Sequence, residues 1–177
     1  MVFCFLAPWN RAMPFDSKCV ANYFLQLAEK NGERLSPMRL IKLVYIAHGW
    51  HLGLLDKPLI NERPEAWKYG PVVPSLYHEF KKFGNEPIAS PATYYDPESG
   101  RLVPHAPPSD EAARSFMNRI WEVYRSFSAI QLSSMTHKPG TPWYITWHDQ
   151  GGKDFQGTDI PQDLIRDHYK PAARQAT

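Results

Sequence analysis

The chain has 177 residues, of which 43% are hydrophobic and 21% are charged, and its formal net charge is +2. This length is typical of one domain, and the apolar content is sufficient for a sizeable core. The near-neutral charge argues against a surface built for nucleic acid or for acidic membranes. The two cysteines, Cys4 and Cys19, are too few for a disulfide framework or a four-thiolate zinc site.

The ends of the chain carry no clear targeting signal. Residues 1–8 are apolar but lack the basic start of a secretory signal, and charged residues interrupt the most apolar stretch before it could span a membrane. We therefore expect a cytoplasmic protein without membrane contact. Residues 1–12 are predicted to be an N-terminal arm, or an upstream extension if Met13 is the initiator. Residues 13–170 are predicted to form the domain, and 171–177 a tail.

Two long helices are predicted near the start of this domain. Asp16 or Ser17 can cap a helix over 17–30, which the following Asn-Gly pair would end. Ser36 can cap a second helix over 37–55, with proline at its first position, where the missing N–H is harmless.

The second helix is apolar on nearly all sides, which predicts a buried, central helix. Its main stripe includes Leu40, Leu43, Val44 and Ala47. Gly49 and Gly53 lie four residues apart and could admit a close helical neighbour, although this pattern is a weak signal outside membranes.

The rest of the chain predicts shorter elements and a mainly α fold, a single compact helical domain with a small β-hairpin or short strand element. The expected elements are extended pieces at 59–60 and 66–67, a break at Gly70-Pro71, and a helix over 73–83. A long loop over 86–108 follows, with a small hairpin near 94–95 and 102–103. A helix capped by Ser109 should run to residue 127, with Phe116, Ile120, Val123 and Phe127 inward. Helices over 129–137 and 142–148 come next, and a last helix from Thr158 or Asp159 to residue 169.

The segment Trp67-Lys68-Tyr69-Gly70-Pro71 is the candidate binding element. It places two aromatics, a lysine and a chain break at the entrance of the predicted helix over 73–83. Such a site can bury an aromatic anchor while it exposes backbone N–H groups, and Trp and Tyr are enriched at interface hot spots. The alternative is a purely structural staple that fixes the angle of that helix.

Histidines offer the main alternative, an enzyme. His48 and His51 lie three residues apart on one helix, a spacing that could present two zinc ligands, but no His-Glu-x-x-His motif or cysteine pair completes a site. Ser133 lies near His137 without the glycine-flanked serine elbow of a hydrolase. We expect polar histidines packed in or beside the core, with no metal, no cofactor and no catalytic set. A metal-dependent or histidine-based hydrolase built on His48, His51 and His137 stays the rival hypothesis.

A DNA-binding regulator is the second rival. The helices over 17–30 and 37–55 are joined by a short glycine-containing turn, as in a helix-turn-helix unit, with Arg39 and Lys42 where a recognition helix would touch DNA. That helix is too apolar and too long for the role, and the chain has no basic stripe. Nucleic acid is not an expected partner.

Three ordered segments resemble the Panacea domain, a family that includes SocA-like antitoxins and phage-associated GepA-like proteins. The segments are 40–50 (Leu-Ile-Lys-Leu-Val-Tyr-Ile-Ala-His-Gly-Trp), 65–72 (Glu-Ala-Trp-Lys-Tyr-Gly-Pro-Val), and Leu132 to His137 followed by Thr141-Pro142-Trp143. The similarity extends from about residue 17 to 169.

The resemblance implies a mainly helical, non-enzymatic antitoxin that binds a cognate protein toxin encoded nearby. It also implies that the protein could act as a proteolytic adaptor, because SocA-like members deliver their toxin to the ClpXP protease. In this context we expect Trp67, Lys68, Tyr69, Gly70 and Pro71 to form a recognition or scaffold element. His137 and Trp143 are expected nearby.

Overall fold

The computed structural model describes residues 13–175, with side chains described through Pro171. The expected arm over 1–12 lies outside the described residues. The last helix continues to Gln175, so it crosses the boundary expected at residue 170 between domain and tail.

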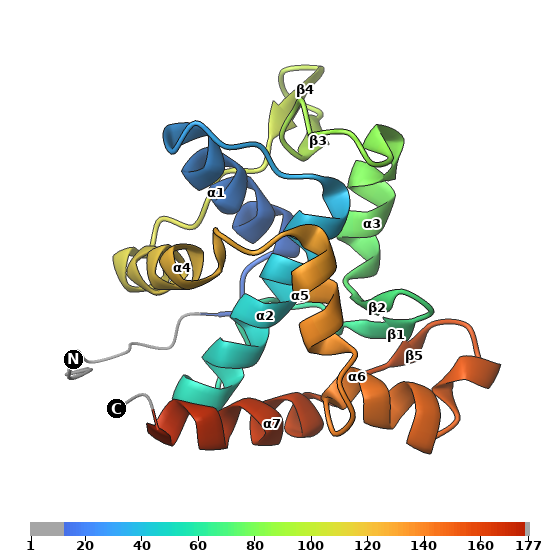
Figure 1. Ribbon diagram of the computed structural model, residues 1–177. Helices are drawn as coiled ribbons and strands as arrows, with labels where there is room; N and C mark the ends of the chain where they lie inside the picture. Colours follow the sequence, from blue (N-terminus) through green and yellow to red (C-terminus); the bar gives the residue numbers. More distant parts are fainter. Residues whose placement is uncertain (1–12, 176–177) are drawn as a thin grey trace.

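Helix α2 (Pro37–Leu55) runs through the middle of the molecule, with other helices on several sides (Figure 1). The Ser36 hydroxyl accepts a hydrogen bond from the Arg39 N–H, and Pro37 occupies the first turn, so the predicted start is confirmed. Leu40, Val44 and Ala47 are fully buried. Helix α2 is apolar on nearly all sides because it is buried at the centre of the core.

The other helices surround α2 and mostly begin at capping residues. Asp16 caps α1 and Ser128 caps α5, the latter with a full capping box. The bounds are α1 (Ser17–Lys30), α3 (Pro74–Phe80) with the 3₁₀ turn η1 (Lys81–Phe83), α4 (Glu111–Tyr124), α5 (Ala129–Thr136), α6 (Pro142–Tyr144) with the π turn η2 (Ile145–Asp149), the 3₁₀ turn η3 (Gly152–Asp154), and α7 (Gln162–Gln175). The mainly helical prediction is confirmed.

A small antiparallel sheet of three strands has the order β2-β1-β5. Its strands are β1 (Glu65–Trp67), β2 (Gly70–Val72) and β5 (Thr158–Asp159). Two predictions were wrong here. Gly70-Pro71 is not a break but the start of β2, and 158–159 is not a helix start but a strand that pairs with Glu65 and Ala66. These pairings are long-range, so no local signal announced them.

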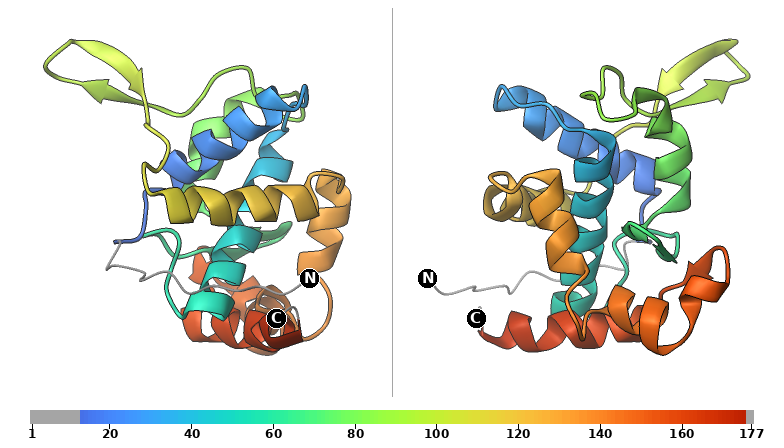
Figure 2. Two further views of the ribbon diagram at one scale, coloured as in Figure 1. Left: turned by 90° about the vertical axis from the view of Figure 1, so that its left-hand side faces the viewer. Right: turned by 45° about the vertical axis from the view of Figure 1, so that its right-hand side comes forward.

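A second hairpin, β3 (Thr93–Asp96) and β4 (Arg101–Pro104), projects from the body of the molecule (Figure 2). Tyr95 pairs with Leu102, and Tyr94 with Val103, which confirms the predicted hairpin. The buried Asn22 side chain of α1 holds the base of this hairpin. Its amide group donates to the carbonyls of Ala92 and His105, and its oxygen accepts from the Ala92 N–H.

Helix α4 differs from its prediction in three details, the first being that it ends at Tyr124 and not at residue 127. Asp110, not Ser109, is the N-cap, because its carboxylate accepts from the Ala113 N–H. Val123, expected inward, is 59% exposed, whereas its neighbour Tyr124 is buried. The predicted inward face was therefore shifted by one residue near the end of the helix.

Glycines 49 and 53 face α7, which crosses the end of α2. A Cβ built on Gly53 would lie 2.8 Å from the carbonyl carbon of Tyr169, and one on Gly49 would lie 2.6 Å from Cδ2 of its ring. The weak sequence signal for a close helical neighbour is thus confirmed, and α7 is that neighbour.

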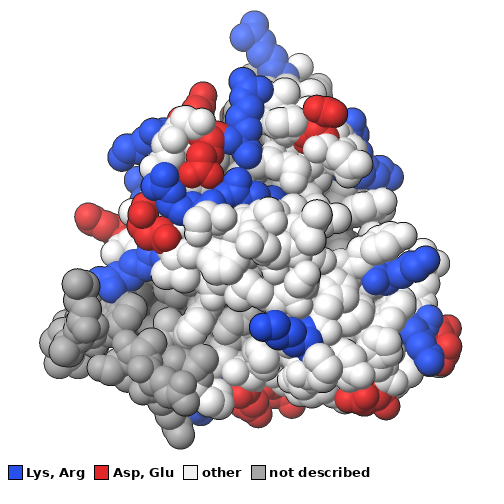
Figure 3. All heavy atoms as spheres, viewed as in Figure 1, with Lys and Arg blue, Asp and Glu red and all other residues white. Residues whose placement is uncertain are grey.

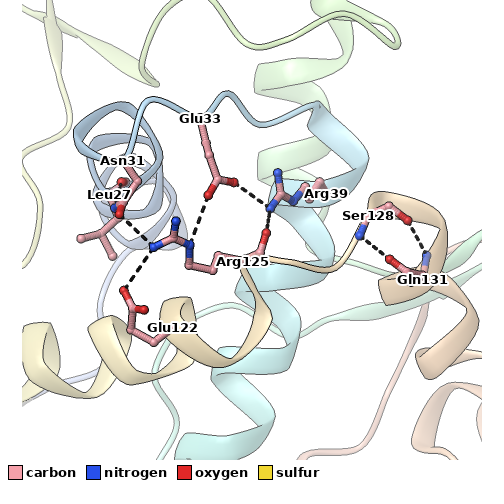
Figure 4. A network of polar contacts seen from close by, with 8 residues as sticks. All are labelled: Leu27, Asn31, Glu33, Arg39, Glu122, Arg125, Ser128 and Gln131. Carbon is pink, nitrogen blue, oxygen red and sulfur yellow. Dashed lines mark hydrogen bonds and ion pairs between the residues drawn. The ribbon is translucent and has the colours of Figure 1, made fainter.

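A polar network fastens the α1–α2 connection to the end of α4 (Figure 4). Glu33 forms ion pairs with Arg39 at 3.1 Å and with Arg125 at 3.2 Å. The Arg39 guanidinium also donates to the carbonyl of Arg125. Arg39 therefore acts in packing, and it is not free to serve as a DNA contact on a recognition helix.

Truncation of α2 core residues should be costly. We expect Leu43→Ala or Leu40→Ala to lower the free energy of unfolding by about 2–5 kcal/mol, because each leaves a cavity in a rigid core. Urea denaturation measures this, with Ile130→Ala, whose parent side chain is 74% exposed, as the control. Losses near zero at both leucines would mean that α2 is not the core helix.

Candidate protein-binding site

The turn between β1 and β2 presents two exposed side chains. Tyr69 is 69% exposed, and the Lys68 ammonium lies 5.6 Å from the centre of its ring. Behind them, the Trp67 indole N–H donates to Glu65 at 2.7 Å, and its ring packs edge-on against Tyr77. The tip is therefore open to solvent while its flank is fixed.

Lys42 of α2 holds this turn from beneath. Its ammonium nitrogen donates to the carbonyls of Tyr69 at 2.7 Å and Pro71 at 2.9 Å, and the residue is only 2% exposed. Burial lowers the pKa of Lys42 from 10.5 to about 7. A neutral amine still has two N–H donors, so it can satisfy both carbonyls without a charge.

Gly70 is required by the geometry of the turn. Its φ is +98°, a region that L side chains rarely adopt. A Cβ at this position would also lie 2.5 Å from Lys42 Nζ and 2.6 Å from Cε1 of His137. The glycine thus lets the turn lie directly against these two side chains.

His137 and Trp143 close the other side of the turn. The Trp143 indole N–H donates to the Trp67 carbonyl at 2.8 Å, and the His137 and Trp143 rings lie 4.1 Å apart. His137 Nδ1 lies 2.6 Å from the Ser133 carbonyl, which only accepts, so Nδ1 carries the hydrogen. It cannot then take a proton from the Ser133 hydroxyl 3.4 Å away, as a hydrolase of this pair would need.

All seven residues predicted from the sequence therefore meet at one place. Trp67 ends β1, Lys68 and Tyr69 form the turn, and Gly70 and Pro71 begin β2, which leads into α3. His137 and Trp143 pack against this hairpin. Sequence reasoning missed Lys42, which it considered only as a DNA contact. The available signal was a single lysine inside an otherwise apolar helical stretch, which points to a buried partner.

The other two histidines of the hydrolase hypothesis, His48 and His51, lie in the core and form hydrogen bonds with the backbone. His48 is fully buried and its Nδ1 accepts from the Ile60 N–H at 3.4 Å, while His51 Nδ1 bonds the Lys57 carbonyl at 2.7 Å. Burial is the main cause that lowers the pKa of His48 to about 3. In the described part of the chain, no cluster of three ligand atoms within 4.8 Å includes His48, His51 or His137.

Comparison with known proteins identifies the family of this chain. The family described as "Antitoxin SocA-like, Panacea domain" matches residues 40–144. The chain belongs to this family. It is also 33% identical, over 155 residues, to "Antitoxin SocA" from Caulobacter vibrioides (strain NA1000 / CB15N), which covers 88% of this chain and 82% of that protein. No solved structure matches the chain.

The region matched by the SocA-like family contains the whole site. It begins in α2, just before Lys42, and ends in α6 after Trp143. Among the described residues, none of the helices is both long and apolar enough to cross a membrane.

Proposed function

We propose that this protein is an antitoxin that binds and neutralises a cognate protein toxin, and that the exposed Lys68–Tyr69 tip is the centre of its recognition surface. The observation that carries the proposal is the contrast between an exposed tip and its support. Tyr69 is open to solvent, yet its own carbonyl is held by a buried lysine. Membership of the SocA-like antitoxin family supports the same function.

A fixed aromatic tip is suited to binding. An anchor whose backbone is already ordered loses less conformational entropy when a partner covers it. Tyrosine combines a large apolar ring with a hydroxyl, and the adjacent Lys68 adds a charge that can select among partners. The described contacts give the side chains of Tyr69 and Lys68 no structural task beyond their mutual cation–π contact.

The neighbouring surface has the composition of a protein interface. The surface over α5 carries few charged side chains, while Lys, Arg, Asp and Glu gather toward α1 and α4 (Figure 3). Ile130 of α5 is 74% exposed. Charged residues are depleted at interface cores, so a partner seated on the tip could extend over α5.

Neutralisation could follow either of two routes. The antitoxin could block the toxin by direct binding, or it could deliver the toxin to ClpXP as an adaptor. Toxin half-life distinguishes them, because delivery shortens it only in cells with active ClpXP, whereas direct blocking leaves it unchanged. Either route requires the recognition surface.

Lys68→Glu combined with Tyr69→Ala should abolish toxin binding and growth rescue while the fold remains intact. At a hot spot, an aromatic anchor that the partner buries and a charge beside it are each worth a few kcal/mol of binding free energy. The measurements are growth rescue and copurification when the protein is coexpressed with the product of the adjacent gene. Tyr95→Ala with Lys82→Glu is the matched control, because Tyr95 is 64% exposed on the other hairpin.

Thermal unfolding separates recognition from a structural role. If the turn is only a staple, the double variant should lose stability in proportion to its lost rescue. Full rescue by a folded double variant would place the recognition surface elsewhere. Failure of the unmodified chain to bind or protect against any adjacent gene product would contradict the antitoxin function itself.

A further inference from the structure

Three side chains with metal-ligand chemistry meet at the start of α1, where the projecting β3–β4 hairpin joins the body. Asp16, Cys19 and His105 each place one ligand atom within 4.8 Å of the other two. They come from segments more than eighty residues apart in sequence, since His105 directly follows β4.

The backbone around this cluster is ordered by other interactions. Asp16 is the N-cap of α1, and only its Oδ1 is used to accept from the Lys18 N–H. Cys19 lies one turn into the helix, and Asn22, one turn further on the same face, binds the carbonyl of His105 at 2.8 Å. The His105 N–H also donates to the Ala92 carbonyl. Asn22 therefore fixes the backbone of His105 opposite Asp16 and Cys19.

The ligand types match zinc. Thiolate, imidazole and carboxylate are its three protein ligands, with metal–ligand distances of about 2.0–2.3 Å, so ligand atoms in a tetrahedral site lie roughly 3–4 Å apart. Because the three atoms lie within 4.8 Å of one another, a contraction of at most about 2 Å would bring them to that spacing. Cys19 is a free thiol, and the buried Nε2 of His105 has no hydrogen-bond partner among the described residues.

An ion can reach the cluster from solvent because Cys19 and His105 are only partly buried. His105 lines a groove of about 510 Å³ between α1 and the loops on either side of the hairpin. The groove is also lined by Leu25, Ile88 and Pro107, but not by Asp16 or Cys19.

We propose that Asp16, Cys19 and His105 bind one zinc-class divalent cation, with water as the fourth ligand, and that the ion fastens the base of the β3–β4 hairpin to α1. Three protein ligands leave one coordination position open. This site is separate from the Lys68–Tyr69 tip, so the inference does not depend on the antitoxin proposal.

Titration with Co²⁺ tests the site directly, because cobalt reports a thiolate ligand through charge-transfer absorption in the near ultraviolet. Chelator-treated full-length protein should bind one equivalent of Co²⁺ with this absorption, and Zn²⁺ should displace it. Cys19→Ser should remove the charge-transfer band. Asp16→Asn, which keeps an N-cap residue, and His105→Ala should each weaken binding at least about tenfold.

Two controls and one structural readout complete the test. His78→Ala should leave the affinity within about twofold, because it removes an exposed histidine outside the cluster. Cys4→Ser should keep the charge-transfer band, because the proposal assigns the thiolate to Cys19. Zn²⁺ should slow hydrogen exchange of the β3–β4 amides in the unmodified protein but not in Cys19→Ser. The proposal is overturned if the intact chain shows no thiolate band, if the band survives Cys19→Ser, or if Cys4→Ser removes it. Binding without slower exchange would overturn the fastening role.

Discussion

Between pH 7 and pH 9 the free energy of unfolding should rise with pH, by up to about 1.4 kcal/mol per pH unit through Lys42 alone. The folded protein binds this proton with a pKa of about 7, whereas the unfolded chain binds it with the ordinary value of 10.5. In this window the unfolded state therefore holds more protons than the folded state, and raising the pH favours folding. The rise should end as the pH approaches 10.5.

Lys42→Met isolates this effect. The variant keeps a long apolar side chain but cannot titrate, so the difference between the two stability profiles should change with pH at the slope given above. Above about pH 10.5, where the lysine is neutral in both states, the variant should also be less stable than the unmodified protein, because the carbonyls of Tyr69 and Pro71 lose their donor, at about 1–3 kcal/mol for each unsatisfied group. Urea denaturation at several pH values measures both. Parallel profiles would show that Lys42 is charged and paired in the folded state.

The elements that could be predicted from the sequence are those set by local signals. Ser36-Pro37 starts α2, and Asp16 caps α1, because capping needs only a few neighbouring residues. Strand β5 could not be predicted in this way. Two residues become a strand only because β1 offers its free edge, and β1 lies far away in the sequence.

The candidate site shows the same division. The aromatic turn could be chosen because tryptophan, lysine, tyrosine and Gly-Pro form an unusual run, but its conformation as a hairpin depends on Lys42 and Trp143. Val123 was placed inward by its spacing from Ile120, yet the neighbouring Tyr124 is the buried one, since its hydroxyl accepts from the Trp50 indole N–H of α2. Tertiary contacts decided both cases.

The crossing of α2 and α7 supplies the second large expected effect. Gly53→Ala should cost about 1–3 kcal/mol through overpacking, even though alanine gains about 1 kcal/mol over glycine in a free helix. The added methyl would lie 2.8 Å from the Tyr169 carbonyl carbon and 3.0 Å from the Lys170 nitrogen. These are backbone atoms, so relief requires a shift of the whole of α7, which carries the fully buried Ile165.

Gly49→Ala is the matched comparison, because the three atoms nearest to its methyl would all belong to the ring of Tyr169. In a Tyr169→Ala background the ring is gone, so Gly49→Ala should become neutral or stabilising by up to about 1 kcal/mol. Gly53→Ala should keep its cost there, because the Tyr169 Cβ at 2.7 Å and the α7 backbone remain. A double-mutant cycle from urea denaturation should thus give a coupling of about 0.5–3 kcal/mol for Gly49 with Tyr169, and a value near zero for Gly53 with Tyr169. Equal coupling at both glycines would mean that α7 moves freely on α2 and that only the tyrosine ring limits their approach.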